Sequence, residues 1–213
     1  MKSRGAMKSP KLRGVLFDAF GTLCRIEQPQ SPYRPLLKCW RGILEKGFEA
    51  ILTRNEPLAK LATEAGLGPE QIARMEKALE TEKQSISLFP ETTETLRILR
   101  THGVKLAIVS NLAEPYGPPL RRIMPFNLDA YIFSYEVGAK KPDSAIYHQA
   151  IHALKVNQEE LIMVGDSYQN DYLAPREMGI RAFLLKRESS STFINQDSIL
   201  PSLGELLLHL KIS

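Results

Sequence analysis

Polar side chains that could act on a substrate follow four apolar runs of this sequence, at the point where each run ends. Asp18 follows the first run and Ser110 the second, Lys141 follows the third, and Asp166 and Asp171 follow the fourth. If the runs are strands of one parallel sheet, their carboxyl ends meet at one edge, where ligands bind in such sheets. We therefore expect these groups to form one site.

Each of these residue types has a chemical task at neutral pH. The carboxylate of Asp18 is already ionised, so it can attack as a nucleophile and form a covalent intermediate that water later breaks. Thr22 and Ser110 carry hydroxyls that would donate hydrogen bonds to an oxyanion. Lys141 would add positive charge that holds substrate and intermediate, and Asn111, directly after Ser110, is a further candidate for substrate binding.

Asp166 and Asp171 indicate a cofactor. If both converge with Asp18, three carboxylates face one obvious cation, Lys141, and their mutual repulsion raises their pKa values unless something compensates. A hard divalent ion does so, because Mg²⁺ takes oxygen ligands, keeps several waters and bridges to substrate phosphate. The acids therefore predict a Mg²⁺ site.

The apolar runs predict the strands that would position these groups. Most runs are apolar at consecutive rather than alternate positions, as strands buried on both faces of a parallel sheet should be. Helical patterns separate them, such as 91–102, which ends before Gly103, and 143–154, which begins after Pro142. This alternation predicts an α/β fold with a doubly wound parallel sheet. The five runs are 12–17, 104–109, 130–134, 161–164 and 180–185.

One long segment interrupts this alternation, because residues 25–88 offer helical patterns and no convincing strand. The helical stretches in it are 34–46, 56–65 and 69–80. An all-helical insert after the first strand indicates a small lid or cap. The predicted organisation is a basic tail over residues 1–11, a Rossmann-like catalytic core over 12–24 and 89–213, and a helical cap over 25–88.

The composition fits one soluble, enzyme-sized unit of 213 residues, 43% hydrophobic and 24% charged. Five basic residues lie within the first fourteen, and without them 23 basic residues face 24 acidic ones, which argues against a nucleic-acid-binding face. Two cysteines, no signal-peptide pattern and no apolar run near the roughly 20 residues of a membrane span favour a cytoplasmic protein. We expect a small-molecule substrate as its partner, and neither nucleic acid nor membrane.

Together the motifs resemble those of the haloacid dehalogenase superfamily, which includes phosphatases, dehalogenases and phosphoryl-transfer enzymes. D-A-F-G-T-L matches its first motif, V-S-N the second, K-P-D the third and G-D-S-Y-Q-N-D the fourth, in the family's order. The insert lies between the first two motifs, where members with an α-helical cap carry theirs. The resemblance implies as magnesium ligands Asp18, the backbone carbonyl of Phe20, Asp166 and Asp171, the last through a water or Lys141.

Phe20 departs from the phosphatases of this superfamily, which usually have a second Asp at that place. That Asp acts as general acid on the leaving alkoxide and then as general base on water, and losing such a group typically costs about 10²–10⁴ in rate. The family's dehalogenases have an aromatic residue there, because halide leaves without being protonated. However, they need no metal and lack the fourth motif in the form found here.

Three hypotheses remain. We give the metal signature more weight, because an idle cluster of acids would be costly to keep, and expect a Mg²⁺-dependent phosphohydrolase that forms an aspartyl-phosphate on Asp18. With Phe20 in place of the acid, its phosphorylated metabolite would need a leaving group that requires no proton, such as an acyl or aryl phosphate, or an acid from the cap. The alternatives are a metal-independent 2-haloacid dehalogenase that uses Asp18, and a weakly active or non-catalytic binding protein on the same scaffold.

Overall fold

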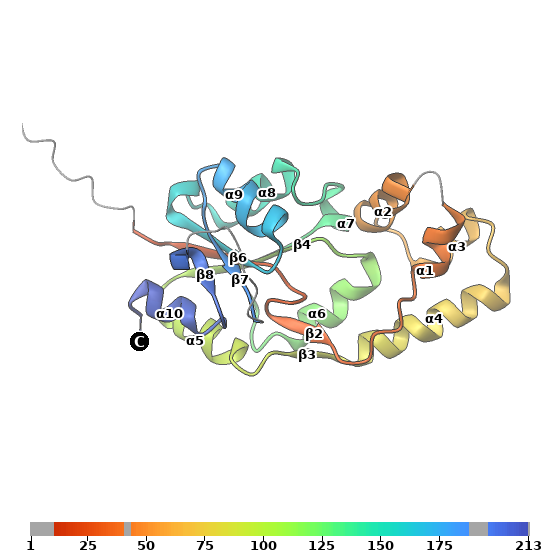
Figure 1. Ribbon diagram of the computed structural model, residues 1–213, viewed down its shortest axis with the longest axis horizontal. Coiled ribbons are helices and arrows are strands. Elements are labelled where there is room, and N and C mark those ends of the chain that lie inside the picture. The colour runs from red at the N-terminus through yellow and green to blue at the C-terminus, as the bar shows by residue number, and fades with distance from the viewer. Residues whose placement is uncertain (1–10, 41–43, 188–195, 213) are drawn as a thin grey trace, which may run out of the picture.

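The centre of the molecule is a six-stranded parallel sheet (Figure 1). The structure is a computed structural model that describes residues 11–40, 44–187 and 196–212, so residues 1–10 of the predicted basic tail lie outside it. The strand order is β5-β4-β1-β6-β7-β8. The strands are β1 (Gly14–Phe17), β4 (Lys105–Ser110), β5 (Ala130–Phe133), β6 (Leu161–Gly165), β7 (Arg181–Leu185) and β8 (Ile199–Leu200).

All five predicted strands are present, within two residues at each end. Their consecutive apolar residues are buried because both faces of the sheet are covered: along β1, Val15 and Phe17 belong to one hydrophobic cluster and Leu16 to the other. Of the six strands in this sheet, β8 alone was not predicted, because a segment of two residues is too short to show a pattern.

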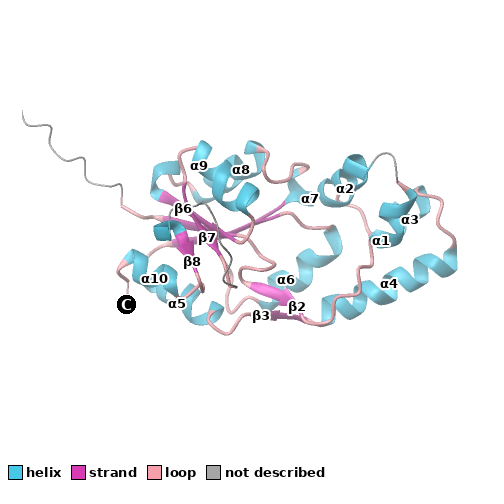
Figure 2. Cartoon of the chain, viewed as in Figure 1, coloured by secondary structure: helices cyan, strands magenta, loops and turns pink. Residues whose placement is uncertain are grey.

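Helices cover both faces of the sheet, which confirms the predicted doubly wound α/β fold (Figure 2). One cluster includes residues of α5 (Thr92–Thr101), α6 (Gly117–Ile123) and α10 (Glu205–Leu210). The other includes residues of α8 (Ser144–Leu154) and α9 (Ala174–Glu177), and a short helix, α7 (Ser134–Val137), follows β5. None of the helices in the described ranges is long and apolar enough to cross a membrane.

The segment between β1 and α5, which we call the insert (residues 25–88), contains α1 (Arg34–Cys39), α2 (Leu44–Thr53), α3 (Leu58–Glu64) and α4 (Pro69–Gln84). The expectation that it holds no strand was wrong, because β2 (Cys24–Ile26) and β3 (Ile86–Leu88) pair antiparallel at its two ends. Each is only three residues long and pairs with a partner about 60 residues away, so neither has a local pattern.

The predicted helix over 34–46 is also corrected, because it is divided in two. Trp40 leaves the helical conformation (φ −90°, ψ 20°) and ends α1. Gly47 of α2 then packs against the indole of Trp40 so closely that a Cβ at position 47 would lie 2.7 Å from its Cε3 atom. The apolar spacing over 34–46 therefore runs across two separate helices, and residues 41–43 between them lie outside the described residues.

A buried carboxylate joins the insert to the core. Glu82, near the end of α4, is 4% exposed and accepts hydrogen bonds from the backbone amides of Gln30 and Ser31, at 2.6 and 2.8 Å. Tyr116, just before α6, donates its hydroxyl to the same carboxylate. Glu82 thus links the chain entering the insert, the helix leaving it and the core.

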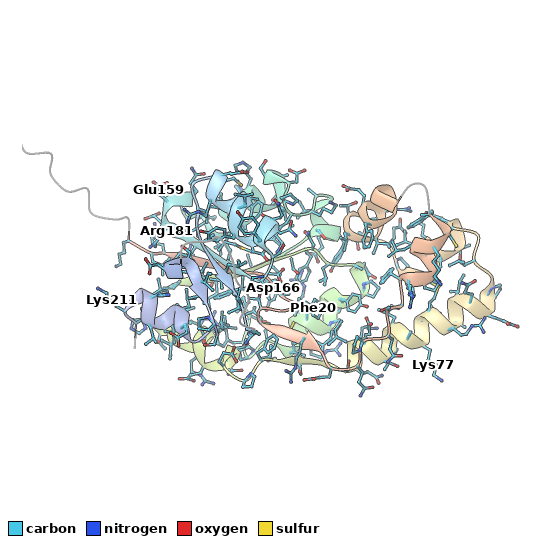
Figure 3. The ribbon with its side chains drawn as sticks, in the orientation of Figure 1. Phe20, Lys77, Glu159, Asp166, Arg181 and Lys211 are labelled. Carbon is cyan, nitrogen blue, oxygen red and sulfur yellow. The ribbon has the colours of Figure 1, made fainter. Side chains whose placement is uncertain are left out.

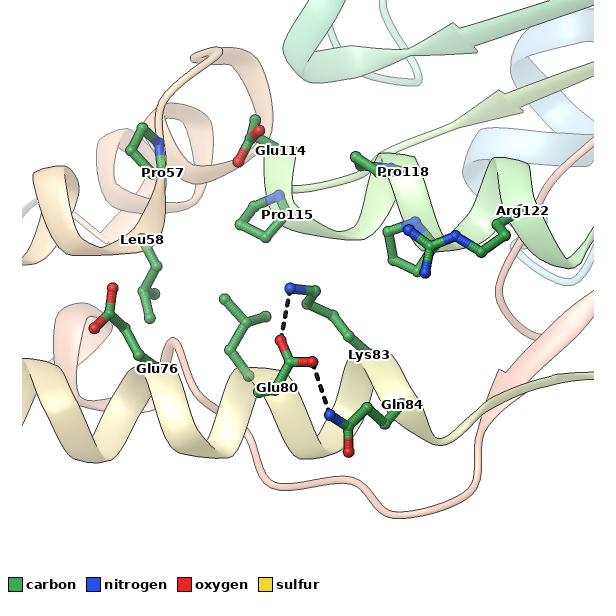
Figure 4. A pocket seen from close by; sticks show the side chains of 12 residues that line it. Pro57, Leu58, Glu76, Glu80, Lys83, Gln84, Glu114, Pro115, Pro118 and Arg122 are labelled. Atoms are coloured by element: carbon green, nitrogen blue, oxygen red, sulfur yellow. Dashed lines mark hydrogen bonds and ion pairs between the residues drawn. The ribbon is translucent and has the colours of Figure 1, made fainter.

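Next to this link lies a groove of about 470 Å³ between α4 and α6 (Figure 4). Its lining includes apolar residues such as Leu58, Leu79 and Pro115, and the ion pair between Lys83 and Glu80 lies on its α4 side. None of the residues that line it comes from the four sequence motifs.

We predict that Glu82→Ala destabilises the protein, because it leaves two backbone amides and a tyrosine hydroxyl without their acceptor. An unsatisfied buried donor costs about 1–3 kcal/mol. The Tyr116 hydroxyl is buried whereas Gln30 and Ser31 are exposed, so the free energy of unfolding should fall by about 2 kcal/mol in urea denaturation. Glu80→Ala is the matched control, since Glu80 lies on the same helix, is 53% exposed and should change stability by less than about 1 kcal/mol. Equal losses in the two variants would contradict the role of Glu82.

Candidate active site

The loop after β1 places Asp18 at the centre of the sheet's carboxyl edge. The Asp18 amide donates to the carbonyl of Val164 in β6, at 2.9 Å, so the ladder between the two strands continues to this residue. The chain then coils around the carbonyl of Ala19, which accepts from the amides of Thr22, Leu23 and Cys24. Asp18 and Thr22, on either side of this tight coil, are both buried.

Gly21 allows this loop to touch the loop after β6. Its φ is +86°, a conformation that side chains disfavour, and a Cβ there would lie 2.2 Å from Oδ2 of Asp166. Figure 3 shows Phe20 and Asp166 next to each other at the middle of the molecule. The glycine of the first motif therefore brings the first and fourth motifs together.

Lys141 lies at the centre of the charged groups. Its Nζ atom is 2.7 Å from Oδ1 of Asp18 and 2.6 Å from Oδ1 of Asp171, and the residue is 2% exposed. Burial by itself lowers the pKa of the ammonium group, but the charges of Asp18 and Asp171 raise it by more, so the pKa lies above its ordinary value. Lys141 is therefore a permanent cation shared by two carboxylates.

Ser110, the last residue of β4, and Asn111, which follows it, orient Asp18 and Lys141. Ser110 donates its hydroxyl to Oδ1 of Asp18 at 3.2 Å, the same oxygen that Lys141 contacts. Asn111 accepts from the amide of Lys141 at 2.7 Å and donates to its carbonyl at 2.9 Å. The amide of Asn111 thus fixes the backbone of the lysine, and its expected contact with substrate stays a prediction.

Asp171 reaches the site from a π-helical segment, Tyr168–Leu173, a rare conformation that is often found at functional sites. Its backbone amide donates to the carbonyl of Ser167 at 2.8 Å, and its carboxylate accepts from the amide of Ser167 at 3.0 Å. The carboxylate lies directly on Gly165, where a Cβ would be 2.3 Å from the Asp171 Cγ. Any larger residue at position 165 would displace Asp171.

Three carboxylates converge at this edge. One oxygen from each of Asp18, Asp166 and Asp171 lies within 4.8 Å of the other two. Partial burial and the charge of Asp18 raise the pKa of Asp166. Burial, helped by Asp18 and opposed by Lys141, raises the pKa of Asp171 to about 6. The pKa values of Asp166 and Asp171 stay raised although Lys141 acts on both and Lys186 acts on Asp166, so the arrangement fits an additional cation with a preference for oxygen ligands.

The hydroxyl of Thr22 has no partner. Among the buried side-chain nitrogen and oxygen atoms of the described residues, only Oγ1 of Thr22 and the hydroxyl of Tyr33 lack a hydrogen bond. A buried donor without an acceptor is unfavourable and is rarely retained without a reason. Thr22 is thus available to donate to a bound oxyanion.

Phe20 lies at the position where phosphatases of this superfamily usually have a general acid. Its half-buried ring meets the ring of Tyr116 edge-on, with centroids 5.9 Å apart. Burial and the hydrogen bond to Glu82 raise the pKa of Tyr116, so this phenol is a poor acid. The oxygens of Glu82 are themselves engaged by three donors. The predicted compensating acid from the insert is therefore not provided by Glu82.

Two residues that contact this site were missed in the sequence. Tyr116 supports Phe20, and Arg187, just after β7, donates to the backbone carbonyls of Gly21 and Thr22. Neither lies in a motif, and both meet the first motif only because the fold brings segments distant in the chain together. No local pattern in the sequence marks them.

The chain is similar to known hydrolases. Residues 12–179 match the haloacid dehalogenase-like hydrolase family. The haloacid dehalogenase-like hydrolase domain-containing protein 3 of Bos taurus is 34% identical over 119 residues, which cover 53% of this chain and 47% of that protein. The phosphoserine phosphatase of Thermus thermophilus is 30% identical over 159 residues, 70% of this chain and 62% of that enzyme.

Among solved structures, a HAD phosphatase from Thermococcus onnurineus superposes with a TM-score of 0.69 at 26% identity, covering 93% of this chain and 98% of that one. The chain spans about half to three fifths of the two curated relatives. The family match nevertheless includes all four motifs and most of the described sheet. The chain belongs to the haloacid dehalogenase-like hydrolase family.

Proposed function

We propose that this hydrolase is a Mg²⁺-dependent phosphohydrolase that acts on a small phosphorylated metabolite. The observation that carries the proposal is the convergence of Asp18, Asp166 and Asp171, of which Lys141 contacts only Asp18 and Asp171. The phosphatase names of two relatives, at 30% and 26% identity, support the same reaction class. Both cysteines are free, in keeping with the expected cytoplasmic location, which stays a prediction.

In the proposed reaction a carboxylate oxygen of Asp18 attacks phosphorus, a bond forms between them, and the bond from phosphorus to the leaving oxygen breaks. Lys141 and Ser110 both contact Oδ1 of Asp18 and so hold the carboxylate in one orientation. Thr22 donates its free hydroxyl to a phosphoryl oxygen. Water then attacks the aspartyl-phosphate, which releases inorganic phosphate and returns Asp18 to its ionised form.

The residues present fit a magnesium ion. Asp18 and Asp166 would hold it together with the backbone carbonyl of Phe20, and Asp171 would act through Lys141, which it contacts, or through a water. Burial, together with the charge of Asp18, raises the pKa values of Asp166 and Asp171, and a bound cation would offset both effects. When bound, the ion would neutralise negative charge on the phosphoryl group.

The insert acts as a cap in this proposal. Glu49 of α2 lies 3.5 Å from Lys140, the neighbour of Lys141, and Glu82 of α4 binds Tyr116 beside Phe20. The insert therefore contacts the core on two sides of the proposed site. With Phe20 and Tyr116 facing the leaving group, the favoured substrates are those whose leaving group needs no proton, such as acyl and aryl phosphates.

A second candidate rests on Phe20 alone. The aromatic residue at this position would suit metal-independent dehalogenation of a 2-haloacid, in which Asp18 displaces halide and no acid is needed. Chloride release from 2-chloropropionate that is unaffected by EDTA would identify this reaction. The acidic cluster favours the phosphohydrolase, because dehalogenation would leave Asp166 and Asp171 without a task.

We predict Mg²⁺-dependent release of phosphate from p-nitrophenyl phosphate and acetyl phosphate, measured with Mg²⁺ and with EDTA. Asp18→Asn should abolish it, because an amide cannot form the covalent intermediate. Glu159→Gln is the control, since Glu159 is exposed and outside the site. Activity in EDTA, or in the Asp18→Asn variant, would exclude the proposed reaction.

Phe20→Asp should extend the activity to alkyl phosphates, since it would supply a general acid for an alkoxide leaving group. We expect the rate of alkyl phosphate hydrolysis to rise by about tenfold or more, with a bell-shaped pH profile. Phe20→Asn is the matched control, because it makes the same packing change without a titratable group. Equal rates in the two variants would show that position 20 does not limit the leaving group.

Mg²⁺ should raise the melting temperature of the wild-type chain by about 5 °C or more at saturation, because a ligand that binds only the folded state stabilises it. Asp166→Asn should lose this shift. Without metal, the variant should be at least as stable as the wild type at pH 7.5, since the raised pKa of Asp166 shows that its charged form is disfavoured there. If Mg²⁺ raised the melting temperature of the variant as much as that of the wild type, Asp166 would not be a metal ligand.

A further inference from the structure

Arg187 connects three segments of the chain that are far apart in sequence. Its Nη2 atom donates to the carbonyl of Thr22 at 2.9 Å, and its Nε atom donates to the carbonyl of Gly21 at 3.3 Å. Its Nη1 atom pairs with Glu91 at 2.6 Å, and its guanidinium lies 3.6 Å from the centre of the Phe89 ring. Arg187 itself follows β7, Phe89 and Glu91 follow β3, and the two carbonyls belong to the loop after β1.

These contacts use the shape of the guanidinium group. Three of its nitrogens donate in three directions within one plane, while the face of that plane covers an aromatic ring. A lysine ammonium is a point charge on a flexible stem and cannot make this set of contacts at once. With a side chain 26% exposed, an ion pair to Glu91 alone would contribute little to stability. The two backbone carbonyls are therefore the informative contacts.

Both carbonyls belong to residues that the proposed mechanism depends on. The peptide of Thr22 carries the buried hydroxyl without a partner, and Gly21 lies against the carboxylate of Asp166. Holding the carbonyls fixes the orientation of these two peptides, and with it the direction in which the Thr22 hydroxyl points. A displacement of about 1 Å in such a group can lower a rate by about 100-fold.

We propose that Arg187 is a positioning residue, which holds the loop after β1 so that the Thr22 hydroxyl meets the phosphoryl group. That the group is phosphoryl rests on the proposed function. The hydrogen bonds by which Arg187 restrains the loop do not depend on that function. Because Glu91 and Phe89 lie at the exit from the insert, the same side chain also ties this loop to that exit.

The first test compares Arg187→Lys with Arg121→Lys. Arg121 is a matched control, because it forms a two-pronged ion pair with Glu136 and lies over the rings of Tyr131 and Phe133, away from the motifs. With p-nitrophenyl phosphate and Mg²⁺, we expect kcat to fall by about tenfold or more in Arg187→Lys and to stay within about twofold in Arg121→Lys. Unchanged kcat in Arg187→Lys would overturn the proposal.

A double-mutant cycle separates positioning from general stabilisation. If Arg187 acts through the Thr22 hydroxyl, Arg187→Lys should lower kcat in an otherwise wild-type chain. In a chain that already carries Thr22→Val, it should lower kcat by less than about a further twofold. If the fold-losses in kcat of the two single variants multiply in the double variant, Arg187 does not act through the Thr22 hydroxyl. In Arg187→Lys alone, orthovanadate should inhibit more weakly by about the same factor as kcat falls, since inhibition and turnover both depend on binding an oxyanion.

Amide hydrogen exchange tests the hold on the loop without any activity. The peptide that covers residues 18–24 should exchange faster in Arg187→Lys than in the wild type or Arg121→Lys, under conditions where all three are folded. Equal exchange rates in the three proteins would show that Arg187 does not restrain this loop. A wild-type chain that releases no phosphate would instead overturn the proposed function, and faster exchange in Arg187→Lys would then still support the hold.

Discussion

The charge balance around Lys141 is the constraint on which the rest of the site depends. A nearly buried ammonium group contacts two carboxylates, and a third lies within 4.8 Å of both. Removing such charges from water is expensive unless they are paired and hydrogen-bonded. The surrounding residues meet this demand: Ser110 binds Asp18, Asn111 fixes the backbone of Lys141, and the amide of Ser167 binds Asp171. The pKa values of Asp166 and Asp171 nevertheless stay raised, which is the charge imbalance on which the proposed magnesium site rests.

The fold supplies these partners through the parallel sheet and through small residues at its edge. Adjacent strands β4, β1 and β6 deliver Ser110, Asp18 and Asp166 to one edge, because parallel strands all end on the same side. Gly21 and Gly165 then allow contacts that a Cβ would prevent, the first with Asp166 and the second with Asp171. The strand order determines which side chains lie at this edge. Gly21 and Gly165 determine how closely Asp166 and Asp171 approach the backbone.

Much of this arrangement could be predicted from the sequence. Strands buried on both faces are apolar at consecutive positions, so β1, β4 and β6 were recognisable, and the acids at their ends were recognisable with them. The short strands β2 and β3 were not, because each is stabilised by a partner about 60 residues away rather than by its own pattern. The same holds for the side chains that support the site: Glu82, Tyr116 and Arg187 contact their partners only through tertiary packing, and their own neighbours in sequence are uninformative.

The contacts of Phe20 have a consequence for how this hydrolase could change its substrates over time. The ring at position 20 rests on Tyr116, and the hydroxyl of Tyr116 rests on a carboxylate of the insert. Residues coupled in this way do not contribute independently. A mutation of Glu82 in α4, which does not contact Asp18, can therefore alter which side chains position 20 tolerates, because Glu82 holds Tyr116 and Tyr116 holds the ring of Phe20. The side chains accepted at position 20 therefore depend on the boundary between insert and core as well as on the first motif itself.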